Sequence, residues 1–117
     1  MRVGFIGLGN VGGKLSGSLL RNGVDVTVFD LDADLVAASV AKGAKAATDA
    51  AGVMRDCDAV ITCLPSPAAC DVVVSQMMPE ICDGKIWMEM STTDEAEVKR
   101  LGALVIAQGG AAVDCPV

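Results

Sequence analysis

Histidine and tyrosine are both missing from this chain of 117 residues, and one Trp and two Phe are its only other aromatic residues. Most zinc sites and all His-based catalytic triads need histidine, so we expect neither kind of site on this chain. The sequence also lacks an apolar run near the ~18 residues of a membrane span, and no charged-then-apolar signal segment opens it. We therefore expect a cytoplasmic protein without membrane partners.

Basic residues are few as well: nine Lys and Arg face 15 Asp and Glu, which gives a formal net charge of −6. A nucleic-acid partner would need a basic stripe, and these nine residues form none in the sequence. The cysteines are odd in number and include no C-x-x-C pair, so we expect reduced structural thiols rather than redox or metal roles. They are Cys57, Cys63, Cys70, Cys82 and Cys115.

Strand-like and helix-like segments alternate along the chain, which is typical of a parallel sheet with right-handed crossovers. We predict strands near residues 2–6, 25–29, 44–47, 58–64, 85–90 and 111–114. The hydrophobic content of 52% is mostly aliphatic, as sheets covered by helices require. The sequence therefore predicts one domain over residues 1–117 with an α/β fold, a doubly wound parallel sheet of about six strands with helices on both faces.

Apolar stripes between the predicted strands mark the helix faces that should pack against the sheet. The three stripes are Val11, Leu15 and Leu19; Leu35, Ser39 and Val40; and Val98, Leu101 and Val105. Turn signals at residues 22–23, 83–84 and 108–110 separate the elements. Asp32 and Thr93 are the predicted helix N-caps.

The opening residues carry the strongest functional signal. The apolar run 2–6 enters a Gly7-x-Gly9-x-x-Gly12 motif, and a helix-like segment follows. In a dinucleotide-binding loop the first glycine allows the tight turn, the second lets the backbone approach the pyrophosphate, and the third lets the helix pack close to the strand. The N–H groups and dipole at the helix start favour phosphate. A purely structural glycine turn is the alternative, since the chain has 13 glycines.

The position of Asp30 strengthens the dinucleotide hypothesis. It ends the second predicted strand, about 20 residues after the glycine motif, where an acidic side chain binds the ribose hydroxyls of the cofactor. A carboxylate there repels the 2′-phosphate of NADP, which needs a nearby cation, and no basic residue follows before Lys42. The sequence therefore favours NAD over NADP. A role of Asp30 as a solvated helix cap is compatible with either cofactor.

Two further strand ends carry candidate residues. The fourth predicted strand breaks at Leu64-Pro65, beside the point where ligands of open α/β sheets bind, although these residues also fit a simple strand terminator. After the fifth strand, Ser91, Thr92 and Thr93 offer hydroxyls either to the ribose or nicotinamide or to the next helix. No side chain forms a convincing general acid, and we expect all five lysines to be solvated: Lys14, Lys42, Lys45, Lys85 and Lys99.

Four ordered segments together resemble the β-hydroxyacid dehydrogenase family, which includes 3-hydroxyisobutyrate dehydrogenases, tartronate semialdehyde and glyoxylate reductases and, more distantly, 6-phosphogluconate dehydrogenase. They are residues 4–12, 63–65, 89–94 and 114–117. The resemblance covers the whole chain and implies the N-terminal Rossmann domain of an NAD-dependent oxidoreductase. The cofactor-binding residues that it implies are Gly7, Leu8, Gly9, Asn10, Val11, Gly12, Asp30, Leu31, Leu64, Pro65 and Thr92.

The resemblance also implies what this chain does not carry. In full-length relatives a helical domain with the catalytic lysine follows and mediates oligomerisation, and the substrate motif continues into Ser-Gly-Gly. This sequence stops before that serine, so we expect cofactor binding without turnover, no catalytic residue on this chain, and a small hydroxy-acid substrate only together with the helical domain. A homo-oligomer remains open.

Two alternatives remain at this point. One is a non-catalytic dinucleotide-binding module that acts as a sensor or in assembly. The other is a domain of an NADPH-linked reductase, of the glyoxylate/succinic semialdehyde or imine reductase type. Relatives that prefer NADPH tend to have Asn-Arg where this chain has Asp30-Leu31, which again favours NAD.

Overall fold

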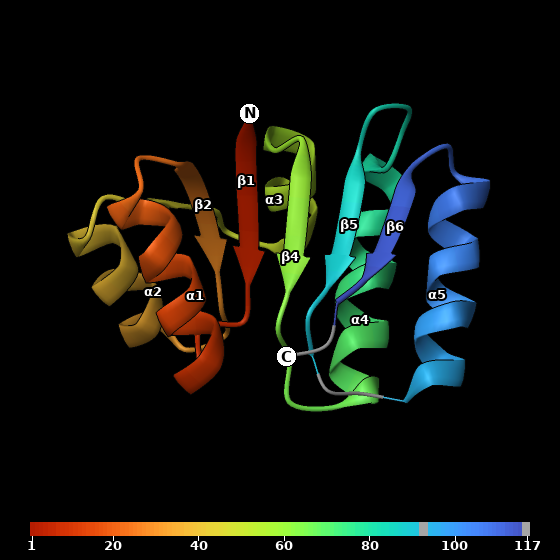
Figure 1. Ribbon diagram of the computed structural model, residues 1–117, viewed down its shortest axis with the longest axis horizontal. Helices are drawn as coiled ribbons and strands as arrows, with labels where there is room; N and C mark the ends of the chain where they lie inside the picture. The colour runs from red at the N-terminus through yellow and green to blue at the C-terminus, as the bar shows by residue number, and fades with distance from the viewer. Residues whose placement is uncertain (92–93, 116–117) are drawn as a thin grey trace.

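The computed structural model describes residues 1–91 and 94–115, in which six parallel strands form one sheet in the order β3-β2-β1-β4-β5-β6 (Figure 1). The strands are β1 (Arg2–Ile6), β2 (Asp25–Phe29), β3 (Lys45–Ala46), β4 (Ala59–Thr62), β5 (Ile86–Glu89) and β6 (Ala111–Asp114). Between them lie α1 (Asn10–Arg21), α2 (Ala33–Ala41), α3 (Ala50–Asp56), α4 (Pro67–Met77) with the short 3₁₀ helix η1 (Met78–Glu80), and α5 (Glu95–Ala107). The predicted doubly wound α/β fold is confirmed.

Helices cover both faces of the sheet, and each face has its own apolar core. On one face α1 and α2 pack over Phe5, Val26 and Val28. On the other face α3, α4 and α5 pack over Val60 and Trp87. No helix within the described residues is both long enough and apolar enough to cross a membrane.

Three strands are shorter than the sequence pattern predicts. β3, at one edge of the sheet, pairs with β2 through two residues only. β4 ends at Thr62, and the N–H of Leu64, two residues further on, donates to a side chain rather than to a strand. β5 begins at Ile86 instead of residue 85. Hydrogen bonding with the neighbouring strands decides where each strand begins and ends. A single sequence does not show which strands are neighbours.

The predicted helix faces are correct except at two valines. Val11 is 48% exposed and Val40 is 43% exposed, whereas the stripe of α5 is buried as predicted. Val11 lies in the first turn of α1, where it lines an open cavity instead of packing on a strand. The predicted cap Asp32 is confirmed by a 2.9 Å hydrogen bond from Asp34 N. The predicted cap Thr93 lies outside the described residues, and α5 is capped by Asp94.

Candidate functional site

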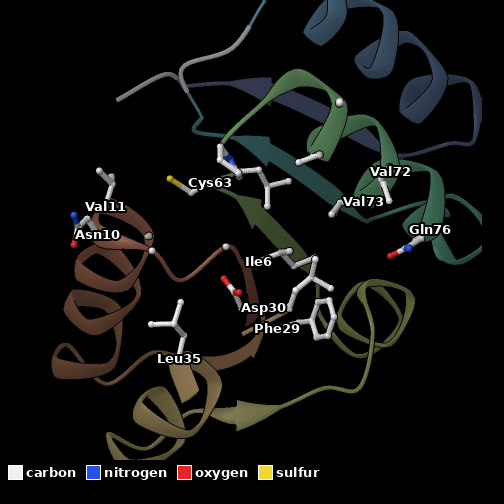
Figure 2. A pocket seen from close by; sticks show the side chains of 18 residues that line it. Ile6, Asn10, Val11, Phe29, Asp30, Leu35, Cys63, Val72, Val73 and Gln76 are labelled. Carbon is white, nitrogen blue, oxygen red and sulfur yellow. The ribbon is translucent and has the colours of Figure 1, made fainter. Parts of the chain in front are cut away.

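The strand order reverses between β1 and β4, and a cavity of about 940 Å³ opens at the carboxyl ends of these strands (Figure 2). The turn from β1 into α1 forms one wall, the end of β2 a second, and the β4–α4 segment a third. Ligands of open α/β sheets bind at this kind of reversal, because the two flanking loops diverge there and leave a crevice.

The three glycines of the opening motif differ in their surroundings: two are required by the fold, and one lines the cavity. Gly7 has a φ of 98°, and a Cβ on it would lie 2.1 Å from the carbonyl oxygen of Cys63. A Cβ on Gly12 would lie 1.9 Å from the carbonyl oxygen of Gly7, so α1 can start this close to β1 only with glycine there. Around Gly9, by contrast, no atom lies within 4 Å of a Cβ position, and Gly9 lines the cavity. The fold needs Gly7 and Gly12, but not Gly9.

Asp30 follows β2 and lines the same cavity. Its Oδ2 accepts a 2.7 Å hydrogen bond from Leu8 N, and its Oδ1 accepts a 2.8 Å hydrogen bond from Asp32 N. The carboxylate is therefore fixed in orientation between the glycine loop and the start of α2. Each carboxylate oxygen can accept a further hydrogen bond, which leaves the group able to bind a ligand hydroxyl.

The wall opposite Asp30 comes from β4 and α4. Leu64 and Pro65 lead from the strand to the helix, and one face of α4 continues the wall with Val72, Val73 and Gln76 (Figure 2). The sequence analysis missed this helix face, although small or apolar residues at positions 68, 69, 72 and 73 have helical spacing. Most of the lining is apolar, as is usual for pockets that hold a planar ring.

Most of the residues implied as cofactor-binding meet in this cavity. Nine of the eleven line it: Gly7, Gly9, Asn10, Val11, Gly12, Asp30, Leu31, Leu64 and Pro65. Leu8 is buried and does not line the cavity; its N–H binds Asp30 instead. Thr92 lies outside the described residues. Leu31 is 95% exposed, at the rim.

A buried polar network lies behind the Leu64 wall, and nothing in the sequence pattern pointed to it. Glu89, at the end of β5, is 0% exposed. Its Oε2 accepts hydrogen bonds from Thr62 Oγ1 at 2.9 Å and Cys70 Sγ at 2.6 Å, and its Oε1 accepts from Ser91 N at 2.5 Å. Trp87 Nε1 in turn donates to Thr62 Oγ1 at 2.9 Å.

Ser91 connects this network to the cavity wall. Its Oγ accepts a 2.6 Å hydrogen bond from Leu64 N, and the residue is buried. The Ser91 hydroxyl oxygen thus holds the backbone between β4 and α4, a contact that the sequence did not predict. Glu89 and Ser91 together fix the position of the Leu64-Pro65 wall.

The thiols differ widely in their surroundings. Burial raises the pKa of Cys57, Cys63 and Cys70, and the nearby carboxylate of Glu89 raises the pKa of Cys63 and Cys70 further. Cys63 faces the cavity (Figure 2), whereas Cys82 is exposed at the surface. All five cysteines are free, as predicted.

These surroundings predict the order of thiol alkylation. The thiolate is the reactive form, so a raised pKa leaves little of it at pH 8. In the folded protein, iodoacetamide should modify Cys82 at least about tenfold faster than Cys57 or Cys70. Peptide mass spectrometry over time measures this, and in denaturant the difference should disappear. Equal rates for Cys70 and Cys82 in the folded protein would contradict the burial of the Glu89 network.

Among the described residues that line the cavity, none is a Lys or Arg, and Asp30 is the one charged side chain. The expectation that Lys85 is solvated is wrong: its Nζ donates to the carbonyl oxygens of Arg55 at 3.0 Å and Cys57 at 2.6 Å, at the end of α3. Over residues 1–91 and 94–115, no three His, Cys, Asp or Glu side chains gather in a way that could hold a metal ion.

Comparisons with known proteins found a matching family model and several relatives. The model of a family described as the NAD binding domain of 6-phosphogluconate dehydrogenase matches residues 2–117. Glyoxylate/succinic semialdehyde reductase 1 of Arabidopsis thaliana is 35% identical over an alignment of 120 residues that covers 100% of this chain and 42% of that protein. The cytokine-like nuclear factor N-PAC of Homo sapiens is 33% identical over an alignment of 119 residues that covers 99% of this chain and 22% of that protein.

A solved structure shows the same fold. The 3-hydroxyisobutyrate dehydrogenase of Mycobacterium tuberculosis, determined with L-serine, has a TM-score of 0.94 and 25% identity; the match covers 99% of this chain and 40% of that one. This chain thus spans only 22% to 42% of the length of these three proteins.

Proposed function

This chain belongs to the family of the NAD-binding domain of 6-phosphogluconate dehydrogenase, and on that premise we propose that it binds NAD in the cavity between β1 and β4 as the cofactor half of an oxidoreductase. The observation that carries the proposal is the fixed carboxylate of Asp30 at the end of β2, across the cavity from the apolar wall of α4. The reaction would be reversible hydride transfer with a small 3-hydroxy or 2-hydroxy acid, as the name 3-hydroxyisobutyrate dehydrogenase indicates for one neighbour.

The residues present fit a dinucleotide. Gly9 lines the cavity with open space where a Cβ would stand, so a pyrophosphate can approach the backbone there. The start of α1 presents its N–H groups and the positive end of its dipole to the same place. Asp30 would accept hydrogen bonds from the ribose, and Val72 and Val73 would cover a ring.

Bound NAD supplies a nicotinamide ring that accepts a hydride. The residues of this chain contribute binding and orientation: the glycine loop fixes the pyrophosphate, Asp30 fixes the ribose, and the Leu64-Pro65 wall limits where the rest of the cofactor can lie. The polar side chains in the described lining of the cavity are Asn10, Asp30, Cys63 and Gln76, and Asp30 is proposed to bind the ribose. Proton transfer to or from the substrate hydroxyl is therefore assigned to another group. We propose that a lysine outside this chain carries out that step, and that this chain alone binds NAD without turnover.

Calorimetric titration with NAD and with NADP tests the proposal. The wild-type chain should prefer NAD, because Asp30 repels a 2′-phosphate and Leu31 offers no cation in its place. Asp30→Asn should weaken NAD binding about tenfold, since charge-assisted hydrogen bonds to the ribose are lost while one oxygen remains for Leu8 N. NADP binding should change less or improve.

Asp25→Asn is the matched control. It removes the same charge at the other end of β2, where Asp25 pairs with Arg2 and Lys45. NAD affinity should stay within a factor of about two. If Asp25→Asn and Asp30→Asn affect NAD binding equally, the role proposed for Asp30 is wrong, and if the wild-type chain binds neither dinucleotide, the proposed function is wrong.

A second candidate is a dinucleotide-binding module without catalysis. The described lining of the cavity contains no Lys or Arg, and one relative is named a nuclear factor rather than a dehydrogenase. NAD binding in a full-length protein that never reduces NAD with any short hydroxy acid would favour this module. Assembly into a homo-oligomer, a cytoplasmic location and the absence of nucleic-acid and membrane partners remain predictions from the sequence.

A further inference from the structure

A second, smaller cavity of about 450 Å³ lies between α1 and α2, next to the proposed cofactor site. Lys14 and Arg21 line it from α1, and Lys42 lines it from the end of α2. No acidic residue lines it within the described part of the chain. We call this cavity the α1–α2 groove.

These three cations differ from the other basic residues. Six of the nine Lys and Arg residues have ion-pair or hydrogen-bond partners: Arg2, Lys45, Arg55, Lys85, Lys99 and Arg100. Among the described residues, Lys14, Arg21 and Lys42 have none. In a chain with a net charge of −6, the basic side chains without a partner therefore gather at one groove. Such a groove attracts anions and repels cations.

The helix spacing places these side chains along one groove. Lys14 and Arg21 are seven residues apart, which puts them on the same face of α1, about 10 Å apart along the axis. Leu35, Ala38 and Lys42 line the groove from α2 at spacings of three and four, so they too share one helix face. Long, flexible side chains reach across such a distance while their stems pack on apolar neighbours.

The groove adjoins the ribose end of the proposed site. Gly9, Asn10 and Leu35 line both cavities, and Leu8, whose N–H binds the carboxylate of Asp30, lines the groove. An anion in the groove would therefore lie close to the ribose hydroxyls that Asp30 is proposed to bind.

We propose that the α1–α2 groove binds a phosphate group, held by Lys14, Arg21 and Lys42. The phosphate can come from two sources with the same chemistry: the 2′-phosphate of NADP, or inorganic phosphate from solution. The first source rests on the proposed dinucleotide function, whereas the second rests only on the charge and shape of the groove. A bound 2′-phosphate there would offset the repulsion from Asp30, and free phosphate would occupy the groove beside NAD.

The experiment compares two double variants of equal net charge. The groove variant, Lys14→Met/Lys42→Met, removes two cations that line the groove. The control variant, Lys45→Met/Lys99→Met, removes two cations that line neither cavity. Inorganic phosphate is titrated by ³¹P NMR, and NAD and NADP are titrated by calorimetry in a buffer free of phosphate. We expect the groove variant, but not the control, to bind phosphate or NADP about tenfold more weakly, with NAD unchanged within about twofold. Circular dichroism checks that both variants fold.

The outcomes separate the two sources and the two proposals. Selective loss of NADP affinity supports the 2′-phosphate, and loss of inorganic phosphate binding supports the free anion. If both variants behave alike toward phosphate and NADP, or if the groove variant loses NAD as strongly as NADP, the phosphate site is refuted. Failure of the wild-type chain to bind NAD would refute the proposed function alone, because the inorganic phosphate titration does not depend on it.

Discussion

Gly9→Ala is expected to weaken NAD binding by about a hundredfold while leaving the chain folded. Gly9 lines the cavity, and a Cβ there would meet no protein atom within 4 Å, so the fold has room for the methyl group. A pyrophosphate in contact with the backbone has no such room. Calorimetry gives the change in NAD affinity, and urea unfolding should show that the free energy of unfolding changes by less than about 1 kcal/mol.

Two other glycines of the same segment serve as controls. Gly17→Ala adds the same methyl group within α1, where the nearest atom, Arg21 Nη1, would lie at an ordinary contact distance of 3.4 Å; NAD affinity should not change. Gly12→Ala should instead destabilise the chain, because its Cβ would lie 1.9 Å from the carbonyl oxygen of Gly7. If Gly9→Ala binds NAD as tightly as the wild-type chain, the glycine loop does not hold the pyrophosphate.

Glu89→Leu should lower the free energy of unfolding by about 3 to 5 kcal/mol. Leucine roughly fills the same volume, so the loss comes from chemistry rather than from a cavity. The hydroxyl of Thr62, the thiol of Cys70 and the N–H of Ser91 all donate to the Glu89 carboxylate, and each would lose its acceptor in the core. Urea unfolding followed by circular dichroism measures the change.

Glu95→Leu is the control for this substitution. Glu95 is an exposed residue of α5 that pairs with Lys99, so its loss should change stability by no more than about 0.5 kcal/mol. Glu89→Gln is an intermediate variant. Its amide keeps one acceptor oxygen, but its NH2 group replaces the other and faces donors of the network. We expect it to be less destabilising than Glu89→Leu. Stability of Glu89→Leu within 1 kcal/mol of Glu95→Leu would mean that the network contributes little.

The sequence predicted the features that depend on local spacing. A strand-turn-helix-strand unit has its glycine turn after the first strand and its acidic residue after the second. The position of Gly7, Gly12 and Asp30 in the fold could therefore be predicted from their position in the sequence. The doubly wound parallel sheet was predicted from the alternation of strand-like and helix-like segments, and the family resemblance from four ordered segments; both are confirmed. The predicted binding roles of these residues are still untested.

The features that the sequence did not predict depend on contacts between distant segments. Glu89 lies between two methionines in a strand, and only its pairing opposite Thr62 and its burial under α4 show that the carboxylate points into the core. Ser91 looked like a ligand group because its partner, Leu64 N, is 27 residues away. Lys85 was expected to be solvated for the same reason. The carbonyl oxygens that its Nζ binds belong to Arg55 and Cys57, at the end of α3 and far from Lys85 in the sequence.

The hydrogen bond from Leu8 N to Asp30 has a consequence for anyone who would redesign the cofactor preference. The carboxylate of Asp30, which we propose discriminates between NAD and NADP, is also the acceptor that ties the glycine loop to the end of β2. Replacing it with a residue that cannot accept, such as arginine, would release Leu8 N and loosen the loop proposed to hold the pyrophosphate. Selectivity and affinity are thus coupled through one side chain, and a successful exchange must bring a new acceptor for Leu8 N along with the new cation.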